Sequence, residues 1–246
     1  MQKNIDVNSL TTDSFFDGRI RIKQHQYGYR FSIDAVILAH HADPKPGDKV
    51  VDLGTGCGIV PLILAYRHPN LNVYGVEIQA ELAAISEQNI LENHLDDRIS
   101  ILHEDMNTLK INRVCGPVDL VISNPPYRKA HSGRINPNRQ RAVARHEIRT
   151  TLGDVIETAR RLLRPFGHYL SIYTADRMTD MFTQLRSAGL EPKFLRSIHS
   201  TRNSEAKLIL VEALKGGGPG IKIGPSLIIY QTDGSYTAEV ENMFAP

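Results

Sequence analysis

The stretch that most constrains this chain is 50–58, which reads Val-Val-Asp-Leu-Gly-Thr-Gly-Cys-Gly. A short apolar run ends in an acid and three glycines follow at alternate positions, after which 59–66 has the pattern of a helix start. Glycine is needed where the backbone turns sharply or a ligand comes close, because a Cβ atom would collide. A strand, a tight glycine turn and a helix form a nucleotide-binding crevice at the carboxyl end of a parallel strand. The turn is not the dinucleotide fingerprint, because Ile59 stands where its third glycine would be.

Strand and helix patterns alternate along the chain after this turn. Such alternation is typical of a mostly parallel sheet covered on both faces, so we predict an α/β fold with a Rossmann-like, doubly wound sheet of seven strands. The predicted strands are 49–53, 72–78, 98–103, 118–123, 168–173, 192–198 and 207–213, and the predicted helices between them are 59–67, 79–93, 151–164 and 176–188.

The two ends of the chain are predicted to form extensions of this sheet. Residues 1–13 are polar and are expected to be frayed, whereas an Asp-Gly turn signal within 16–22 predicts a small hairpin, and Ser32 is a good N-cap for a helix over 33–39. The glycine-rich stretch 216–220 indicates a flexible connection, and 226–231 and 236–240 are predicted to pair as a terminal hairpin. The expected division is an N-terminal extension over 1–48, a central domain over 49–215, and a C-terminal linker and hairpin over 216–246.

Composition limits the classes of protein and of site. The net charge over 246 residues is only +2, so global charge does not indicate a nucleic-acid binder. Cys57 and Cys115 have no Cys-x-x-Cys partner, and no Cys/His cluster has the spacing of a zinc site. The first residues, 1–6, lack the apolar stretch typical of a signal peptide, and no run approaches the ~18 apolar residues of a membrane helix. We therefore expect a cytoplasmic protein without a metal or a membrane contact, and the oligomeric state is left open.

Acidic residues follow the next two strands where a nucleoside could lie. Glu77 comes 21 residues after Gly56 (77 − 56 = 21), about where an acid accepts hydrogen bonds from a ribose, although a solvated strand-end acid is the alternative. Asp105 could bind an exocyclic amine and Met106 could pack on an adenine, although a simple turn is the alternative there. A ligand with a ribose and an adenine but no phosphates fits best, and S-adenosylmethionine is such a ligand. The predicted cofactor residues are Phe31, Asp52, Gly54, Thr55, Gly56, Glu77, Ile78, Asp105, Met106 and Asn124.

The most specific stretch is Asn124-Pro125-Pro126-Tyr127, which directly follows the strand predicted over 118–123. Two prolines stiffen the turn and remove two backbone donors, so that the Asn124 side-chain oxygen and the Pro125 carbonyl can point together into the crevice. Tyr127 offers a flat face beside them. A proline turn that merely closed a strand would not account for an asparagine before it and a tyrosine after it.

With these residues the chain resembles the class I S-adenosylmethionine-dependent methyltransferases, in the amino-methylating branch that carries Asn-Pro-Pro-Tyr. More narrowly, it resembles the bacterial tRNA adenine-N6 methyltransferases that act on a valine tRNA next to the anticodon. The likeness covers roughly residues 15–214. The glycine turn and Asn-Pro-Pro-Tyr are shared by many relatives, whereas Phe31–Ala35 and the Arg-His-Glu of 145–147 point to the subfamily. The resemblance implies that 49–215 is the methyltransferase domain.

The resemblance also implies that Asn124, Pro125 and Tyr127 are catalytic. Hydrogen bonds from adenine N6 to Asn124 and to the Pro125 carbonyl would favour a pyramidal nitrogen whose lone pair aims at the sulfonium methyl group. Tyr127 would stack on a base turned out of its stack.

A basic segment follows the catalytic turn, because 128–149 holds seven arginines and lysines and one acid, Glu147. A basic loop in this position can hold phosphates near the target base, although charge runs are usually solvated surface loops. The predicted RNA contacts are Arg128, Lys129, Arg134, Arg139, Arg141 and Arg145. A second candidate patch consists of Arg19, Arg21, Lys23 and Arg30.

Two other functions stay open at the level of sequence. Protein methyltransferases that modify a glutamine of release factors share Asn-Pro-Pro-Tyr, but they usually carry a helical N-terminal domain, whereas the 53 residues before Gly54 here predict a hairpin and one helix. A non-catalytic RNA-binding module on the same scaffold is the other alternative, against which the intact glycines and the intact 124–127 stretch argue.

Overall fold

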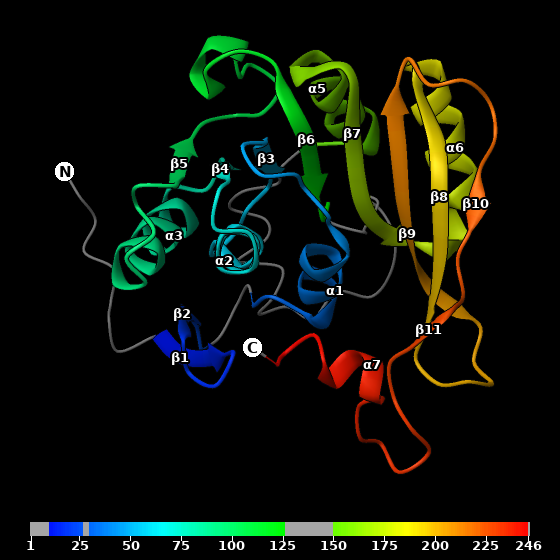
Figure 1. Ribbon diagram of the computed structural model, residues 1–246, viewed down its shortest axis with the longest axis horizontal. Helices are drawn as coiled ribbons and strands as arrows, with labels where there is room; N and C mark the ends of the chain where they lie inside the picture. The colour runs from blue at the N-terminus through cyan, green and yellow to red at the C-terminus, as the bar shows by residue number, and fades with distance from the viewer. Residues whose placement is uncertain (1–9, 27–29, 126–149, 246) are drawn as a thin grey trace, which may run out of the picture.

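The computed structural model describes residues 10–26, 30–125 and 150–245. At its centre lies a mostly parallel sheet with helices on both faces (Figure 1). Its seven long strands are β3 (Lys49–Leu53), β4 (Asn72–Glu77), β5 (Ile99–His103), β6 (Val118–Ser123), β7 (Leu163–Thr174), β8 (Leu190–His199) and β9 (Ala206–Lys215). They are ordered β8-β9-β7-β6-β3-β4-β5, and only β9 runs antiparallel to its neighbours. The predicted fold class is thus confirmed.

Two hydrophobic cores, one on each face of the sheet, explain the apolar strands. The first core is covered by α1 (Ile33–His41), α2 (Ile59–Arg67) and α3 (Ala80–Glu92). The second is covered by α5 (Leu152–Leu162), α6 (Met178–Ser187) and the 3-10 turn η2 (Ile111–Val114), while a further 3-10 turn, η3 (Ala175–Arg177), precedes α6. Val50 faces the first core and Val51 the second, so β3 is apolar on both sides as parallel strands usually are.

The order of the strands creates a switch point between β3 and β6. The chain adds β4 and β5 on one side of β3 and then returns to place β6 on the other side. In open α/β sheets ligands bind outside the carboxyl ends of the strands at such a point. A ligand site is therefore expected among the residues that follow β3, β4, β5 and β6.

The N-terminal hairpin is confirmed, and it begins earlier than the sequence predicts. β1 (Leu10–Phe15) pairs with β2 (Ile20–His25) in antiparallel register. The prediction that 1–13 are frayed is wrong for 10–13, which form most of β1; residues 1–9 lie outside the described part. Asp13 of β1 is held by an ion pair with Arg30 at 3.0 Å and by a hydrogen bond from Gln24, which gives this polar segment its partners.

The predicted C-terminal hairpin is wrong. Two short strands, β10 (Lys222–Ile223) and β11 (Leu227–Ile228), instead extend the sheet in parallel along β8. One isolated bridge joins Tyr230 to Tyr236, and the expected second arm becomes the short helix α7 (Ala238–Glu241). Burial explains the change, because Val240 of α7 and Met243 in the turn that follows it both enter the first core.

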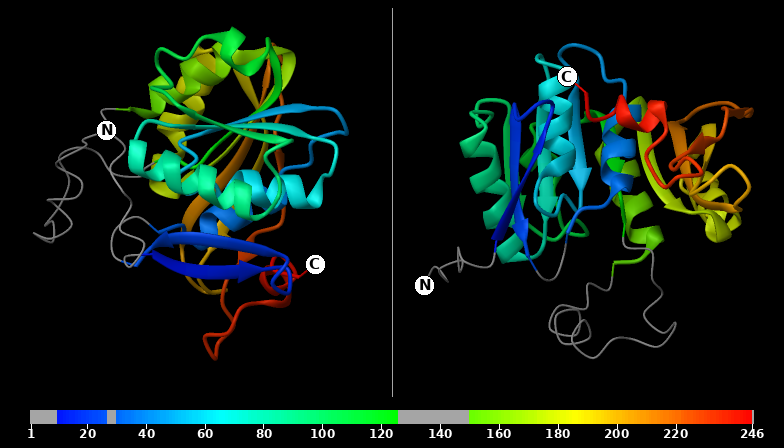
Figure 2. Two further views of the ribbon diagram at one scale, coloured as in Figure 1. Left: turned by 90° about the vertical axis from the view of Figure 1, so that its left-hand side faces the viewer. Right: turned by 90° about the horizontal axis from the view of Figure 1, so that it is seen from below.

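The N-terminal hairpin and the segment after α7 contact each other on the face of the first core (Figure 2). The backbone nitrogen of Phe16 donates to the Phe244 carbonyl at 3.2 Å, and the rings of Phe15 and Phe244 stack with centroids 5.6 Å apart. Within the described residues no helix is long and apolar enough to cross a membrane.

Candidate active site

Four chain segments leave the sheet side by side at the switch point. The β3–β6 register ends with Leu53 opposite Ser123, so the next residues, Gly54 and Asn124, emerge together. The β3–β4 register ends with Leu53 opposite Val76, which brings Glu77 to the other side of Gly54. Because these strands are parallel, their carboxyl ends share one edge, and Gly54, Glu77 and Asn124 begin side by side there.

The glycine turn after β3 has the backbone that its sequence requires. Gly54, Gly56 and Gly58 have φ values of +80°, +60° and +87°, a region that side chains with a Cβ atom rarely enter. At Gly58, the N-cap of α2, a Cβ atom would also lie 2.4 Å from Oγ of Ser86 on α3. The backbone nitrogens of Gly54 and Thr55 both donate to the Val76 carbonyl, at 2.9 and 3.0 Å, and fix the turn to β4.

Glu77 is a buried acid that holds backbone on both sides of the crevice. Glu77 is only 4% exposed, and its two carboxylate oxygens accept hydrogen bonds from Gly56 N at 3.0 Å and from Gln79 N at 2.9 Å. Burial raises the pKa of Glu77, and the backbone donors act in the opposite direction. Glu77 is therefore not a solvated acid at the end of a strand, which was the alternative interpretation of the sequence. A carboxylate has about four acceptor sites, so the oriented group retains capacity for a ligand diol.

Asp52 and Thr55 lie buried beneath the same turn. Asp52 is 2% exposed, and burial raises the pKa of its carboxyl to about 7, against a smaller lowering by the Thr55 hydroxyl. Within the described residues neither Asp52 Oδ2 nor Thr55 Oγ1 has a hydrogen bond of good geometry. Gly75 stands opposite Asp52 in the sheet, where a Cβ atom would come within 3.0 Å of Thr55 Oγ1. Buried polar atoms without partners are costly, so this pair is suited to polar groups of a ligand.

The end of β6 is tied to the glycine turn. Oγ of Ser123 donates to the Leu53 carbonyl at 3.0 Å, which fixes the position where Asn124 begins. Asn124 is half-buried and Pro125 is buried. Tyr127 and the six predicted RNA contacts, Arg128, Lys129, Arg134, Arg139, Arg141 and Arg145, lie outside the described residues.

Comparison with known proteins decides the family. The family model described as methyltransferase small domain matches residues 30–178. The chain belongs to the methyltransferase small-domain family. A Porphyromonas gingivalis protein named tRNA1(Val) (adenine(37)-N6)-methyltransferase is 31% identical over 96% of this chain and 95% of its own length. A protein of the same name from Tolumonas auensis is 26% identical over 92% of each chain.

Solved structures share the fold of this methyltransferase. A predicted O-methyltransferase from Agrobacterium tumefaciens, protein Atu636, has a TM-score of 0.67 at 23% identity, over 85% of this chain and 94% of that one. Geranyl diphosphate C-methyltransferase from Streptomyces coelicolor A3(2), solved with S-adenosyl-L-homocysteine, has a TM-score of 0.52 at 15% identity, over 74% of this chain and 78% of that one. The predicted enzyme class, a methyltransferase, is confirmed by the family match.

The loop after β5 is held in place by residues that the sequence did not single out. Asp105 is half-buried, and its Oδ1 accepts from Asn107 N at 2.9 Å. From α5, Thr158 Oγ1 and Arg161 Nη2 both donate to the Met106 carbonyl, at 3.2 and 2.8 Å. The Met106 side chain packs against the second core. No sequence pattern marks Thr158 or Arg161, because both lie within an ordinary amphipathic helix.

The two remaining predicted cofactor residues stand apart from one another. Ile78 follows Glu77 and is 39% exposed, which leaves an apolar side chain free beside the strand ends. Phe31 is half-buried and packs on the N-terminal hairpin, with its ring centroid 5.5 Å from that of Phe15. The structure thus assigns Phe31 a contact with the hairpin that the sequence did not predict.

In the second candidate basic patch, Arg19, Arg21, Lys23 and Arg30, part of the positive charge is neutralised by ion pairs. Lys23 pairs with Glu92 at 2.5 Å and Arg30 pairs with Asp13 at 3.0 Å, so two of its four cations are engaged by carboxylates.

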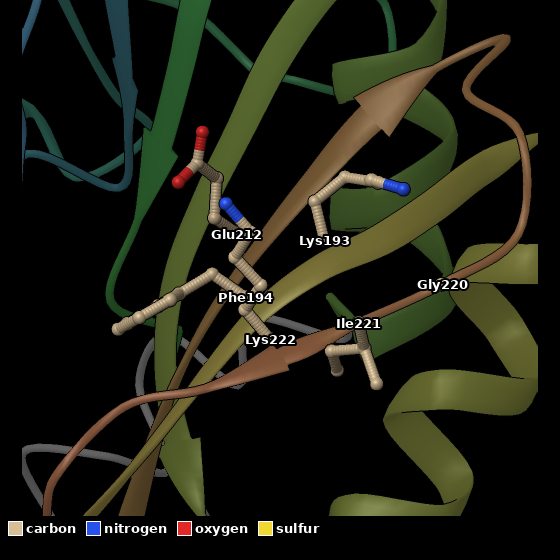
Figure 3. A pocket seen from close by; sticks show the side chains of 6 residues that line it. All are labelled: Lys193, Phe194, Glu212, Gly220, Ile221 and Lys222. Carbon is tan, nitrogen blue, oxygen red and sulfur yellow. The ribbon is translucent and has the colours of Figure 1, made fainter.

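A separate groove of about 550 Å³ lies at the β8 edge of the sheet, away from the switch point (Figure 3). Its lining residues are Lys193, Phe194, Glu212, Gly220, Ile221 and Lys222. The strands β9 and β7 stand between β8 and β6, so this groove contains none of the strand ends described above. The candidate active site is therefore the edge of the sheet where Glu77, the glycine turn and Asn124 follow neighbouring strands.

Proposed function

We propose that this methyltransferase transfers the methyl group of S-adenosylmethionine to N6 of an adenine in tRNA, the adenine next to the anticodon of a valine tRNA. The observation that carries the proposal is the pair of groups on the two strand ends that flank β3. Glu77 presents a buried, oriented carboxylate on one side of Gly54, and Asn124-Pro125 begins on the other side. A nucleoside-binding acid and an amine-binding turn would then lie on either side of the glycine turn.

The residues around the glycine turn fit S-adenosylmethionine. Glu77 would accept hydrogen bonds from the two ribose hydroxyls, because each carboxylate oxygen keeps acceptor capacity beyond its bond to backbone. Asp52 and Thr55 would receive the cationic amine of the methionine part, which supplies the partners that their buried oxygens lack among the described residues. Asp105 would bind the adenine amine and Ile78 would cover the ring. The bound cofactor supplies an electrophilic methyl group on a sulfonium.

Asn124 and Pro125 would prepare the acceptor nitrogen. The lone pair of adenine N6 is delocalised into the ring and is a poor nucleophile. Hydrogen bonds from its two hydrogens to the Asn124 side-chain oxygen and the Pro125 carbonyl favour a pyramidal nitrogen and orient its lone pair. Tyr127 would stack on the base, and the extra proton leaves to solvent after transfer.

Two observations favour tRNA over a protein substrate. Relatives that match nearly the whole chain are named as enzymes acting on tRNA1(Val). The basic run over 128–149 follows Asn124-Pro125 directly in the sequence, where cationic residues can hold phosphates beside a bound base.

The experiment is a methyl-transfer assay with radiolabelled S-adenosylmethionine on bulk bacterial tRNA and, in parallel, on release factor. Digestion of the tRNA followed by mass spectrometry identifies the modified nucleoside, and purified valine tRNA tests the finer assignment. We expect N6-methyladenosine in valine tRNA and no label in release factor. Asn124→Ala serves as the control for contaminating activity. Label in release factor alone would contradict the RNA assignment, and label in neither substrate would contradict the enzymatic one.

A further inference from the structure

We propose that Asn89 of α3 is a positioning residue for the cofactor site and that it couples the N-terminal hairpin to the glycine turn. The ligand in this proposal rests on the function proposed above. Asn89 itself lies in no predicted site, and its side chain would not touch the cofactor. Its role follows from three hydrogen bonds made in the interior of the protein.

The amide group of Asn89 is fully used. Its Nδ2 donates to the Cys57 carbonyl at 2.8 Å and to the Lys23 carbonyl at 2.9 Å, while its Oδ1 accepts from Lys23 N at 2.7 Å. The residue is completely buried. A primary amide has two donor hydrogens, and here each finds a backbone carbonyl, one in the glycine turn and one in β2.

Asn89 therefore holds the glycine turn from α3, as Glu77 holds it from β4. Gly56 N is bound by the Glu77 carboxylate from β4, and the carbonyl of the next residue, Cys57, is bound by Asn89 from α3. These two anchors fix the orientation of the backbone between Gly56 and Gly58. Without Asn89 the buried Cys57 carbonyl loses its partner, and a rotation of the Cys57–Gly58 peptide that satisfies it elsewhere would break the 3.0 Å hydrogen bond from Gly58 N to the Thr55 carbonyl, which closes the turn that carries Gly56 N.

The hydrogen bonds of Asn89 to Lys23 connect it to a second predicted cofactor segment, the one around Phe31. Lys23 belongs to β2, and the next residue, Gln24, is buried and accepts a hydrogen bond from Phe31 N at 3.1 Å through its Oε1. The hairpin, which lies alongside α2 and α3 in both views of Figure 2, thus joins the glycine turn to the segment just before α1. In this proposal the hairpin fixes the position of the Phe31 segment relative to the glycine turn, and Asn89 makes the hydrogen bonds that join the hairpin to the turn.

Asn93 provides a matched control one helical turn along α3. Its Oδ1 accepts from Arg21 N at 2.9 Å and its Nδ2 donates to the Arg21 carbonyl at 2.6 Å, so it docks β2 in the same way. Its remaining bond goes to the Asn89 backbone carbonyl at 2.7 Å, within the helix. Removal of Asn93 weakens the docking of β2 at Arg21 but leaves the hydrogen bonds of Asn89 to Lys23 and to the glycine turn in place.

The experiment compares Asn89→Ala and Asn93→Ala with the wild type by calorimetric titration of S-adenosylmethionine, steady-state kinetics on tRNA and thermal unfolding. We expect Asn89→Ala to raise Kd and KM for S-adenosylmethionine about tenfold, the equivalent of one lost hydrogen bond. KM for tRNA and kcat at saturating cofactor should stay within about twofold, because the change acts on cofactor binding. Asn93→Ala should lower Tm but leave the cofactor Kd within about twofold.

Asn89→Ser, a smaller polar replacement, repeats the measurement if Asn89→Ala does not fold. A folded Asn89 variant with the cofactor affinity of Asn93→Ala would overturn the proposal, as would failure of both Asn89 variants to fold under conditions where Asn93→Ala folds, because the role would then be structural only. A wild-type protein that does not bind S-adenosylmethionine would instead refute the proposed function.

Discussion

Glu77→Ala tests the cofactor site most directly, because the structure gives this carboxylate two separable roles. As the acceptor for ribose hydroxyls, its loss should weaken S-adenosylmethionine binding by about 1–3 kcal/mol, the range for hydrogen bonds to a charged partner. That is a rise of about 5- to 150-fold in Kd. Glu77 also accepts from the buried Gly56 N at 3.0 Å and from the partly buried Gln79 N at 2.9 Å, so its loss leaves both donors without this partner. The free energy of unfolding should fall by about 1–3 kcal/mol, offset in part because a carboxylate whose pKa is raised by burial is also removed.

Calorimetry with S-adenosylmethionine measures the first effect and urea denaturation measures the second. Glu104→Ala is the matched control, because Glu104 is the acid that follows the neighbouring strand β5 but is paired with Arg113 at the surface, at 2.5 Å. A surface ion pair contributes about 0–1 kcal/mol, so this control should change stability little and cofactor affinity not at all. A folded Glu77→Ala protein with wild-type cofactor affinity would remove Glu77 from the site.

Three further predictions follow from the same site. The pKa of Asp52, raised to about 7, exceeds the unfolded value, so protonated Asp52 contributes to stability fully below about pH 4 and this contribution is lost as the pH rises through about 7. Asp52→Asn should abolish this pH dependence in denaturation curves. It should also abolish the rise of cofactor affinity with pH that ionised Asp52 gives the wild type. Asn124→Ala should keep cofactor affinity by calorimetry but slow methyl transfer about a hundredfold or more, and near wild-type turnover would limit Asn124 to shaping the turn. Tyr127→Ala should depress methylation but leave the slope of log tRNA affinity against log salt concentration unchanged. Neutralising Arg134, Arg139 and Arg141 together should flatten that slope by about two to three units. An unchanged slope in the triple variant would show that these arginines do not hold phosphates.

The sequence alone determined the fold class and most of the strand-end site. The bounds of β3 and α2 agree with the predicted 49–53 and 59–67, because glycines at positive φ and an apolar strand leave few alternatives locally. The spacing between Gly56 and Glu77 places an acid beside the turn in any strand-helix-strand unit of this length. These are signals that lie within a few residues of one another, or that recur with the period of a strand or a helix.

Other features depend on tertiary burial that no local pattern records. Residues 236–240 alternate like a strand, yet 238–241 form a helix from which Val240 enters the first core, and Phe244 beyond it stacks on Phe15. The polar segment 10–13 becomes a strand because β2 and Arg30 supply its partners.

The environment of the site was decided only by the tertiary structure. The raised pKa of Asp52 follows from its complete burial beneath the turn, which no residue next to it in the sequence dictates. Asn89 reads as an ordinary polar residue of a helix, yet its partners Cys57 and Lys23 lie 32 and 66 residues away. A single amide has no periodic signature, and its hydrogen bonds exist only once α3 is packed between the hairpin and the glycine turn. The sequence identifies the groups that can bind the cofactor, and the packing of distant segments determines which other residues hold those groups in place.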